Sequence, residues 1–267
     1  MLWFFTILIV LFLILPVMII IPMSFSASRY LEFPPPGFST QWYQAFFGNP
    51  QWVNALKISV ELAVLTTVLS LVLGILAAEG LSKSEFRGKD TIIEIFMMPM
   101  LVPGIIVGIA IYRFEAEISL ASTFSGLLIA HTLMAVPFVI RTVLSNLIGL
   151  NPNYELASRS LGAGRLTTFF RVTVPIIKPA IFSGAMFAFA TSFDEIIVTQ
   201  FLCGIRITTL PKRIWDGLNQ QLDPTITAIA AIVIVIISLV MVLSNSKTLF
   251  GREPRSVPQE ETDLDDT

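Results

Sequence analysis

The chain has 267 residues, of which 54% are hydrophobic and only 13% charged, and its mean hydropathy is +0.79. This balance is too apolar for a soluble domain whose surface must face water, so we expect a membrane protein. A net charge of −2 excludes the strongly basic surface of nucleic-acid-binding proteins. One cysteine and one histidine offer neither an internal disulfide nor a metal-ligand cluster, and we expect no cofactor.

Several apolar segments are long enough to cross a bilayer, which takes about 20 mostly apolar residues in a helix. The six segments are residues 3–25, 57–79, 92–112, 122–146, 179–201 and 225–246. Small residues follow the first segment as in a signal peptide, but it lacks a basic leader and its apolar run is too long, which favours an anchor. The pattern predicts an all-α polytopic fold with both termini on one side.

Lysine and arginine divide unequally between the two sets of connections. One set holds ten, namely Lys83, Arg87, Lys89, Arg159, Arg165, Arg171, Lys178, Lys247, Arg252 and Arg255. The other holds five, namely Arg29, Arg113, Arg206, Lys212 and Arg213. Because positively charged short loops stay in the cytoplasm, this distribution predicts that both termini are cytoplasmic. The tail, residues 251–267, is acidic and lacks aromatic residues, which predicts disorder.

The third segment contains Pro99, Pro103, Gly104 and Gly108. Prolines and glycines at membrane depth are typical of transporter helices that bend or break. Close packing against a neighbouring helix would also explain the glycines.

The longest predicted cytoplasmic connection, residues 149–178, contains a helix start and a helix stop. Its asparagines can cap a helix, a proline suits the first turn, and Glu155 places negative charge near the positive end of the helix dipole. The short helix ends near Gly162, and Pro175 and Pro179 mark the point where the chain re-enters the membrane.

The spacing inside this connection resembles that of permease subunits of binding-protein-dependent ABC importers. Their signature reads Glu-Ala-Ala, three residues, Gly, nine residues, Ile, any residue, Leu-Pro. The matching positions are Leu156, Ala157, Ser158, Gly162, Val172, Val174 and Pro175. Leucine stands at the place of the signature glutamate, and Glu155 lies one residue earlier, about 100° away around a helix. An ordinary amphipathic interfacial helix would explain the apolar and basic residues but not the spacing from Gly to Pro.

This resemblance implies a coupling helix that docks into a groove of an ATPase subunit. The positions that it assigns to coupling are Glu155, Leu156, Ala157, Gly162 and Pro175. It also implies the type I importer fold with six transmembrane helices, a transmembrane domain over residues 1–250, and a place in the bacterial inner membrane. The implied partners are a second permease in a heterodimer, two ATPase subunits and an external solute-binding protein.

Two further stretches narrow the resemblance. SFDEIIVTQFL at 192–202 and TLPKRIWDGLNQQLDPTITA at 209–228 are similar to the spermidine/putrescine branch, in its second permease. Related branches that carry aminoethylphosphonate or iron share some of this pattern, so other solutes remain open.

Two acids inside the fifth segment are candidates for a solute path, because intramembrane acids generally face a bundle interior or an aqueous cavity. Asp194 lies 15 residues beyond Pro179, about 22 Å along a helix, in the outer part of the predicted span. Nearby aromatic faces suit an ammonium group. The candidates are Asp194, Glu195, Thr191, Phe187 and Phe193. Alternatively, the acids cap the helix or pair with Arg206 or Arg213.

Other functional classes lack their signatures. No GxxxxGK[ST] phosphate loop occurs, so ATP must be hydrolysed by partner subunits. The chain has no HExxH or nucleophile motif of a membrane enzyme. A stand-alone channel or ion-coupled carrier would not need the coupling signature.

Overall fold

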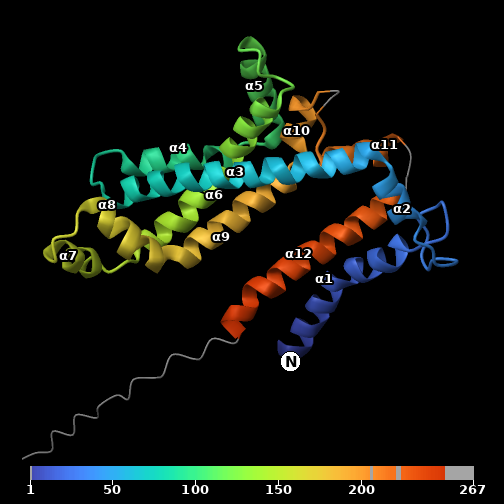
Figure 1. Cartoon of the computed structure of the whole chain (residues 1–267), viewed down its shortest axis with the longest axis horizontal. Coiled ribbons are helices and arrows are strands. Elements are labelled where there is room, and N and C mark those ends of the chain that lie inside the picture. The colour runs from blue at the N-terminus through green and yellow to red at the C-terminus, as the bar shows by residue number, and fades with distance from the viewer. Residues whose placement is uncertain (1, 205–206, 221–223, 250–267) are drawn as a thin grey trace, which may run out of the picture. The chain divides into compact units, whose positions relative to one another are not determined.

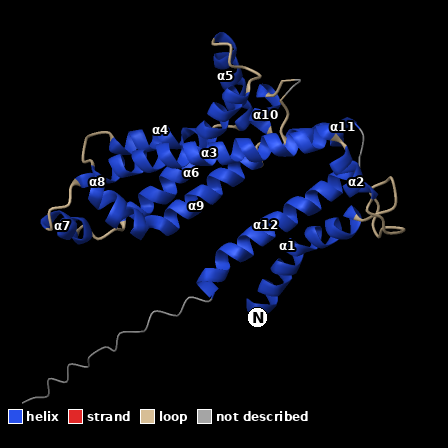
Figure 2. Ribbon diagram, viewed as in Figure 1, coloured by secondary structure: helices blue, strands red, loops and turns tan. Residues whose placement is uncertain are grey.

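The computed structural model describes residues 2–204, 207–220 and 224–249, so the acidic tail and Arg206 lie outside the described residues. Helices and loops make up this described part, and it contains no β-strand (Figure 2). The helices are α1 (Leu2–Ser24), α2 (Gln41–Gly48), α3 (Pro50–Lys83), α4 (Lys89–Leu101), α5 (Gly104–Glu117), α6 (Phe124–Ile148), α7 (Asn153–Ser160), α8 (Arg165–Thr168), the π-helical turn η1 (Phe169–Thr173), α9 (Val174–Phe193), α10 (Ile197–Leu202), α11 (Leu210–Gln220) and α12 (Thr225–Leu249).

The chain divides into two compact units. The first comprises the described parts of residues 1–45 and 224–267, and in it α1 packs against α12. The hydroxyls of Ser24 and Tyr43 lie 2.7 Å apart in a hydrogen bond that ties the end of α1 to α2. The second unit, residues 46–223, contains the remaining helices.

The core of the second unit lies among α3, α6 and α9, which run side by side (Figure 1). Its larger cluster consists of Ala78, Leu81, Ala135, Val139, Ile140, Val143, Leu144, Leu147, Ile177 and Ala188. On α9 the buried face is a stripe of small residues, Gly184, Ala188 and Ser192, spaced four apart. This spacing keeps the three residues on one side of the helix, and that side packs into the core.

Within the described residues, four helical segments are long and apolar enough to cross a membrane. They are Trp3–Ser24, Pro50–Lys83, Phe124–Ile148 and Arg165–Phe193. The predictions of helices at 3–25, 57–79 and 122–146 are thereby confirmed, although α3 begins seven residues earlier than its predicted segment, at Pro50 rather than residue 57. The helix α12 covers the sixth segment.

The third segment is broken into two helices, at the prolines and glycines that indicated a bend or a break. Helices α4 and α5 meet at an angle of 100°, and if they form a single broken span the number of candidate spans rises to five. Val102 has extended backbone angles, φ −78° and ψ 134°, directly before Pro103. A residue before proline is disfavoured in the α conformation, which explains why the helix stops there.

The prediction of a continuous fifth helix over 179–201 was wrong. The helix begins at Arg165, passes through η1 and ends at Phe193, and α10 starts at Ile197. Pro175 therefore does not mark a break, because the chain is helical on both sides of it. Proline cannot donate to the carbonyl four residues earlier, and the wider π turn directly before it accommodates that missing bond.

Candidate functional site

The two acids proposed for the solute path lie in the break between α9 and α10, not inside a helix. Asp194 is the C-cap of α9, with φ −95° and ψ 0°, and it is exposed. Phe187 is 53% exposed and Thr191 is half-buried. Because Phe187, Thr191 and Asp194 follow the spacing i, i+4, i+7, they share one side of α9, about 100° around the helix from its buried stripe.

Glu195 is turned toward α10 and caps it. Its Oε1 accepts a hydrogen bond of 2.8 Å from the backbone N–H of Val198. Its carbonyl accepts one of 2.9 Å from the hydroxyl of Thr199. These contacts agree with the capping alternative for Glu195, whereas Asp194 is exposed.

His131, on α6, contacts both helices that border this break, α9 and α10. The residue is 1% exposed, and its Nδ1 lies 2.9 Å from Ser192 Oγ while its Nε2 lies 3.1 Å from Thr199 Oγ1. Since Thr199 uses its only hydroxyl proton on the carbonyl of Glu195, it must accept from Nε2–H of His131. Nδ1 then accepts from Ser192, so a neutral imidazole satisfies all three groups. His131 is thus a structural contact between helices.

The two aromatic candidates are each held by stacking. Phe187 on α9 stacks with Phe138 on α6, with ring centroids 6.2 Å apart and an interplanar angle of 21°. Phe193 stacks with Phe189, one turn earlier on α9, at 5.7 Å and 10°. Phe187 lies two helical turns below Asp194, about 10 Å along the axis, and shares its stripe.

Arg213, the other alternative partner for the acids, binds elsewhere. Its guanidinium lies 4.9 Å from the ring centroid of Trp52, and its Nη2 donates to Gln51 on α3. The N–H of Leu210 donates to Ser59 Oγ at 2.7 Å, which also fixes the start of α11 on α3. The helix α11, in the predicted outer connection before α12, therefore packs on the first turns of α3.

A further acid, Glu115 at the end of α5, was not predicted as a site residue. It is 1% exposed, and among the described residues neither carboxylate oxygen has a hydrogen-bond partner. The carboxylate lies against Gly126, where an added Cβ would come within 2.5 Å of Oε2. Only the absence of a side chain at that position allows this approach.

Two apolar hollows border α4, with volumes of about 310 and 300 Å³. The first is lined by Ile93, Met97, Met100, Leu101, Arg141, Leu144, Ser145 and Ile148. Neither hollow is lined by Asp194 or Glu195, and Asp194 is exposed on the surface of the chain. In the described part of the chain no group of three or more His, Cys, Asp and Glu side chains is arranged to hold a metal.

The connection over 149–178 forms the predicted short helix, α7, with a tight exit. Asn151 Oδ1 accepts from the N–H of Asn153 at 2.9 Å and starts the helix. Gly162 ends it with φ +88°, and its N–H donates to the carbonyl of Arg159 at 2.9 Å. Since L side chains rarely adopt this φ, the turn requires glycine even though an added Cβ would meet no atom within 4 Å.

The outward side of this connection carries apolar side chains. Leu156 is 56% exposed, Leu161 89% and Leu166 75%, and Ala157 and Pro175 are also exposed. Exposed leucines concentrated on one short segment are typical of a surface that meets a partner.

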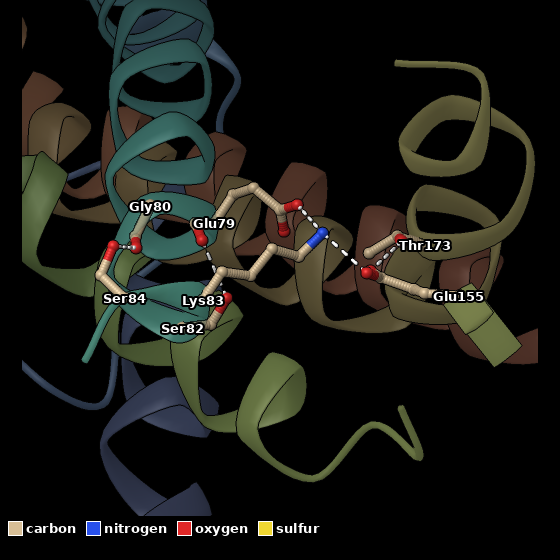
Figure 3. A network of polar contacts seen from close by, with 7 residues as sticks. All are labelled: Glu79, Gly80, Ser82, Lys83, Ser84, Glu155 and Thr173. Atoms are coloured by element: carbon tan, nitrogen blue, oxygen red, sulfur yellow. Dashed lines mark hydrogen bonds and ion pairs between the residues drawn. The ribbon is translucent and has the colours of Figure 1, made fainter. Parts of the chain in front are cut away.

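Glu155 points the other way, into a polar network of the chain itself (Figure 3). Its Oε2 lies 2.9 Å from Nζ of Lys83, the last residue of α3, and its Oε1 accepts from Thr173 Oγ1 at 2.7 Å. Lys83 also pairs with Glu79, one turn earlier on α3. The resemblance assigned Glu155 to an ATPase contact together with Leu156 and Ala157. Unlike these exposed neighbours, Glu155 has its carboxylate engaged within the chain.

The network holds the carboxyl of Glu155 in its ionised form. Burial opposes ionisation, but hydrogen bonds from Lys83 and Thr173 and the charges of Lys83 and Arg159 outweigh it and keep the pKa of Glu155 below its ordinary 4.5. Lys83 and Thr173 were not predicted as members of this site. The only sequence signal for their proximity was the charge distribution, which assigned the connection after Lys83 and the connection over 149–178 to the same side of the membrane.

Comparisons with known proteins agree with this architecture. Residues 70–253 match the family described as "Binding-protein-dependent transport system inner membrane component". The spermidine/putrescine transport system permease protein PotC of Haemophilus influenzae is 30% identical over 234 residues, which cover 87% of this chain and 90% of that protein. The putrescine transport system permease protein PotI of Escherichia coli K12 is 28% identical over 236 residues, covering 86% and 84%.

A solved structure shows the same fold. It belongs to a bacterial ABC transporter involved in the import of the acidic polysaccharide alginate. The TM-score is 0.68 over 91% of this chain and 93% of that chain, with 18% sequence identity.

Proposed function

The chain belongs to the family of binding-protein-dependent transport system inner membrane components, and from that premise we propose that it carries a polyamine such as spermidine or putrescine. It is a permease, a transport subunit and not an enzyme, and a multi-pass membrane protein. Its similarity to PotC and PotI supports the polyamine as solute.

The proposed assembly has four kinds of component. This chain pairs with a second permease to enclose the path, two ATPase subunits bind the cytoplasmic side, and an external binding protein delivers the solute. The transmembrane domain extends over residues 1–250 with six spans, and both termini are cytoplasmic. Hydrolysis of ATP by the partners drives alternating access. The exposed apolar side of α7 supports its role as the coupling helix.

The observation that carries the solute proposal is the exposed stripe on α9. Asp194 is exposed at its outer end, and Thr191 and Phe187 continue the stripe along the helix. An ammonium group is attracted both to a carboxylate and to an aromatic face, so an extended polyamine could contact several residues at once. Because this acid opens onto a surface of the chain, the second permease would complete the path opposite it.

Uptake into proteoliposomes tests the proposal. The complete complex, with its ATPases inside and binding protein outside, is supplied with labelled spermidine, putrescine or aminoethylphosphonate. We expect ATP-dependent accumulation of a polyamine that stops without the binding protein. Accumulation of the anion alone would assign the chain to a related branch, and uptake without ATPase subunits would make it a channel or carrier.

A further inference from the structure

The polar network at the end of α3 connects three elements through one carboxylate (Figure 3). Glu155 on α7 uses Oε2 for Lys83 on α3 and Oε1 for Thr173, the last residue of η1. Since η1 continues directly into α9, Glu155 joins the short cytoplasmic helix to two spanning helices at once.

The geometry of the contacts is that of a specific link. Both oxygens of Glu155 are engaged, and Thr173 is fully buried, so its hydroxyl holds a fixed position in the protein. Glu79 pairs with the same ammonium group and keeps the Lys83 side chain directed along α3. A carboxylate that accepts from two donors on different elements resists rotation more than one held by a single contact.

The two sides of α7 thus have different contacts. Leu156 is 56% exposed, and it is the next residue after Glu155, about 100° around the helix. An ATPase subunit that moves the exposed leucine side would displace Glu155 with it, because both belong to one turn of helix.

We propose that Lys83, Glu155 and Thr173 form a strut that transmits displacement of α7 to α3 and α9. The three are positioning residues for transport: they act by keeping the spanning helices in step with the coupling helix. This inference rests on the proposed function, in which α7 meets the ATPase.

The ion pair of the strut adds a small stability that the fold does not depend on. The Lys83 side chain is 47% exposed and that of Glu155 is 21% exposed, and pairs of this kind stabilise a fold only weakly. Variants should therefore fold and assemble, and the effect should appear in the coupling of ATP hydrolysis to transport.

A charge swap in the reconstituted complex tests the strut. The variants are Lys83→Glu, Glu155→Lys and the double swap, and Lys178→Glu is the control because Lys178 is an exposed cation on α9. The measured quantity is solute transported per ATP hydrolysed. We expect each single reversal to lower this ratio about fivefold or more, the lower end of coupling between linked sites, and the double swap to restore most of it.

Thr173→Val tests the second contact without changing charge. It removes the hydroxyl and keeps the shape, so we expect a smaller loss of the same ratio with unchanged ATPase assembly. Normal coupling in the single reversals, or a double swap no better than either, would overturn the strut. Loss of the ATPase from the purified complex in every Glu155 variant, the swap included, would also overturn it by making Glu155 a direct ATPase contact.

The outcomes separate the strut from the proposed function. If the native complex transports an anion, the polyamine proposal fails and the swap is measured with that anion. If the native chain transports without ATPase subunits, both proposals fail.

Discussion

Two adjacent acids at the end of α9 have different surroundings. Glu195 spends one carboxylate oxygen on the N–H of Val198 and caps α10, while Asp194 is exposed on the stripe with Thr191 and Phe187. The sequence placed the pair in the outer part of the fifth segment, but hydropathy could not separate them. The surroundings of the two acids depend on where α9 ends. At that end His131 contacts Ser192 on α9 and Thr199 on α10.

His131 should stabilise this break. Replacement by phenylalanine removes both hydrogen bonds and leaves the buried Ser192 hydroxyl without its partner on α6, which typically costs about 1–3 kcal/mol. Thermal unfolding of the purified complex measures the loss. Ser183→Ala is the control, because the Ser183 hydroxyl is exposed and bonds only within α9. Equal stability of His131→Phe and the native chain would contradict the assigned network.

The stability contribution of Glu155 should depend on pH. Its folded-state pKa lies below the ordinary 4.5, so the contribution is complete above that value and is lost as the pH falls through the lowered pKa. The difference in unfolding temperature between the native chain and Glu155→Gln should therefore be constant from about pH 7 to about pH 5 and shrink in more acidic buffer. A difference that does not change with pH would show that the ion pair does not contribute.

At the scale of elements, the apolar spans and a bend in the third segment were predictable, but the break between α9 and α10 was not. A run of about 20 apolar residues identifies α1, α3 and α6. Hydropathy alone does not distinguish one long apolar helix from two short apolar helices that follow each other. Pro103 marked the third segment as unusual, yet many prolines only kink a membrane helix. Pro175 suggested the point where the chain re-enters the membrane, but it lies in a continuous helix. The π turn η1 before it accommodates the hydrogen bond that proline cannot donate.

The turn after α7 yields a prediction with a matched control. Gly162 has φ +88°, whereas Gly164 has φ −71°, and an added Cβ would meet no atom within 4 Å at either position. Gly162→Ala should therefore cost about 1–2 kcal/mol through backbone conformation alone and weaken retention of the ATPase, while Gly164→Ala should do neither. Co-purification of the ATPase with each variant measures this, and equal behaviour of the two would contradict the proposed role of the turn.

At the scale of the molecule, the charge distribution divided the connections into two sets but did not predict which of them meet. Lys83 and Glu155 come from two connections assigned to the same side, and the structure pairs them. Arg213, from the opposite set, contacts Gln51 in the first turn of α3. The partners inside each set could not be predicted, because residues far apart in sequence carry no local signal for one another. The buried acid Glu115 shows the same limit, since the approach to Gly126 is purely tertiary.

The most direct test of the account is solute-stimulated ATPase activity of the reconstituted complex with its binding protein. Native protein is compared with Asp194→Asn, and with Glu115→Gln as the control, because Glu115 is an acid buried on another helix, α5. We predict that spermidine or putrescine stimulates the native complex, that Asp194→Asn abolishes the stimulation while basal hydrolysis remains, and that Glu115→Gln retains it. Equal stimulation of native and Asp194→Asn complexes, or stimulation by aminoethylphosphonate alone, would contradict a polyamine path at Asp194.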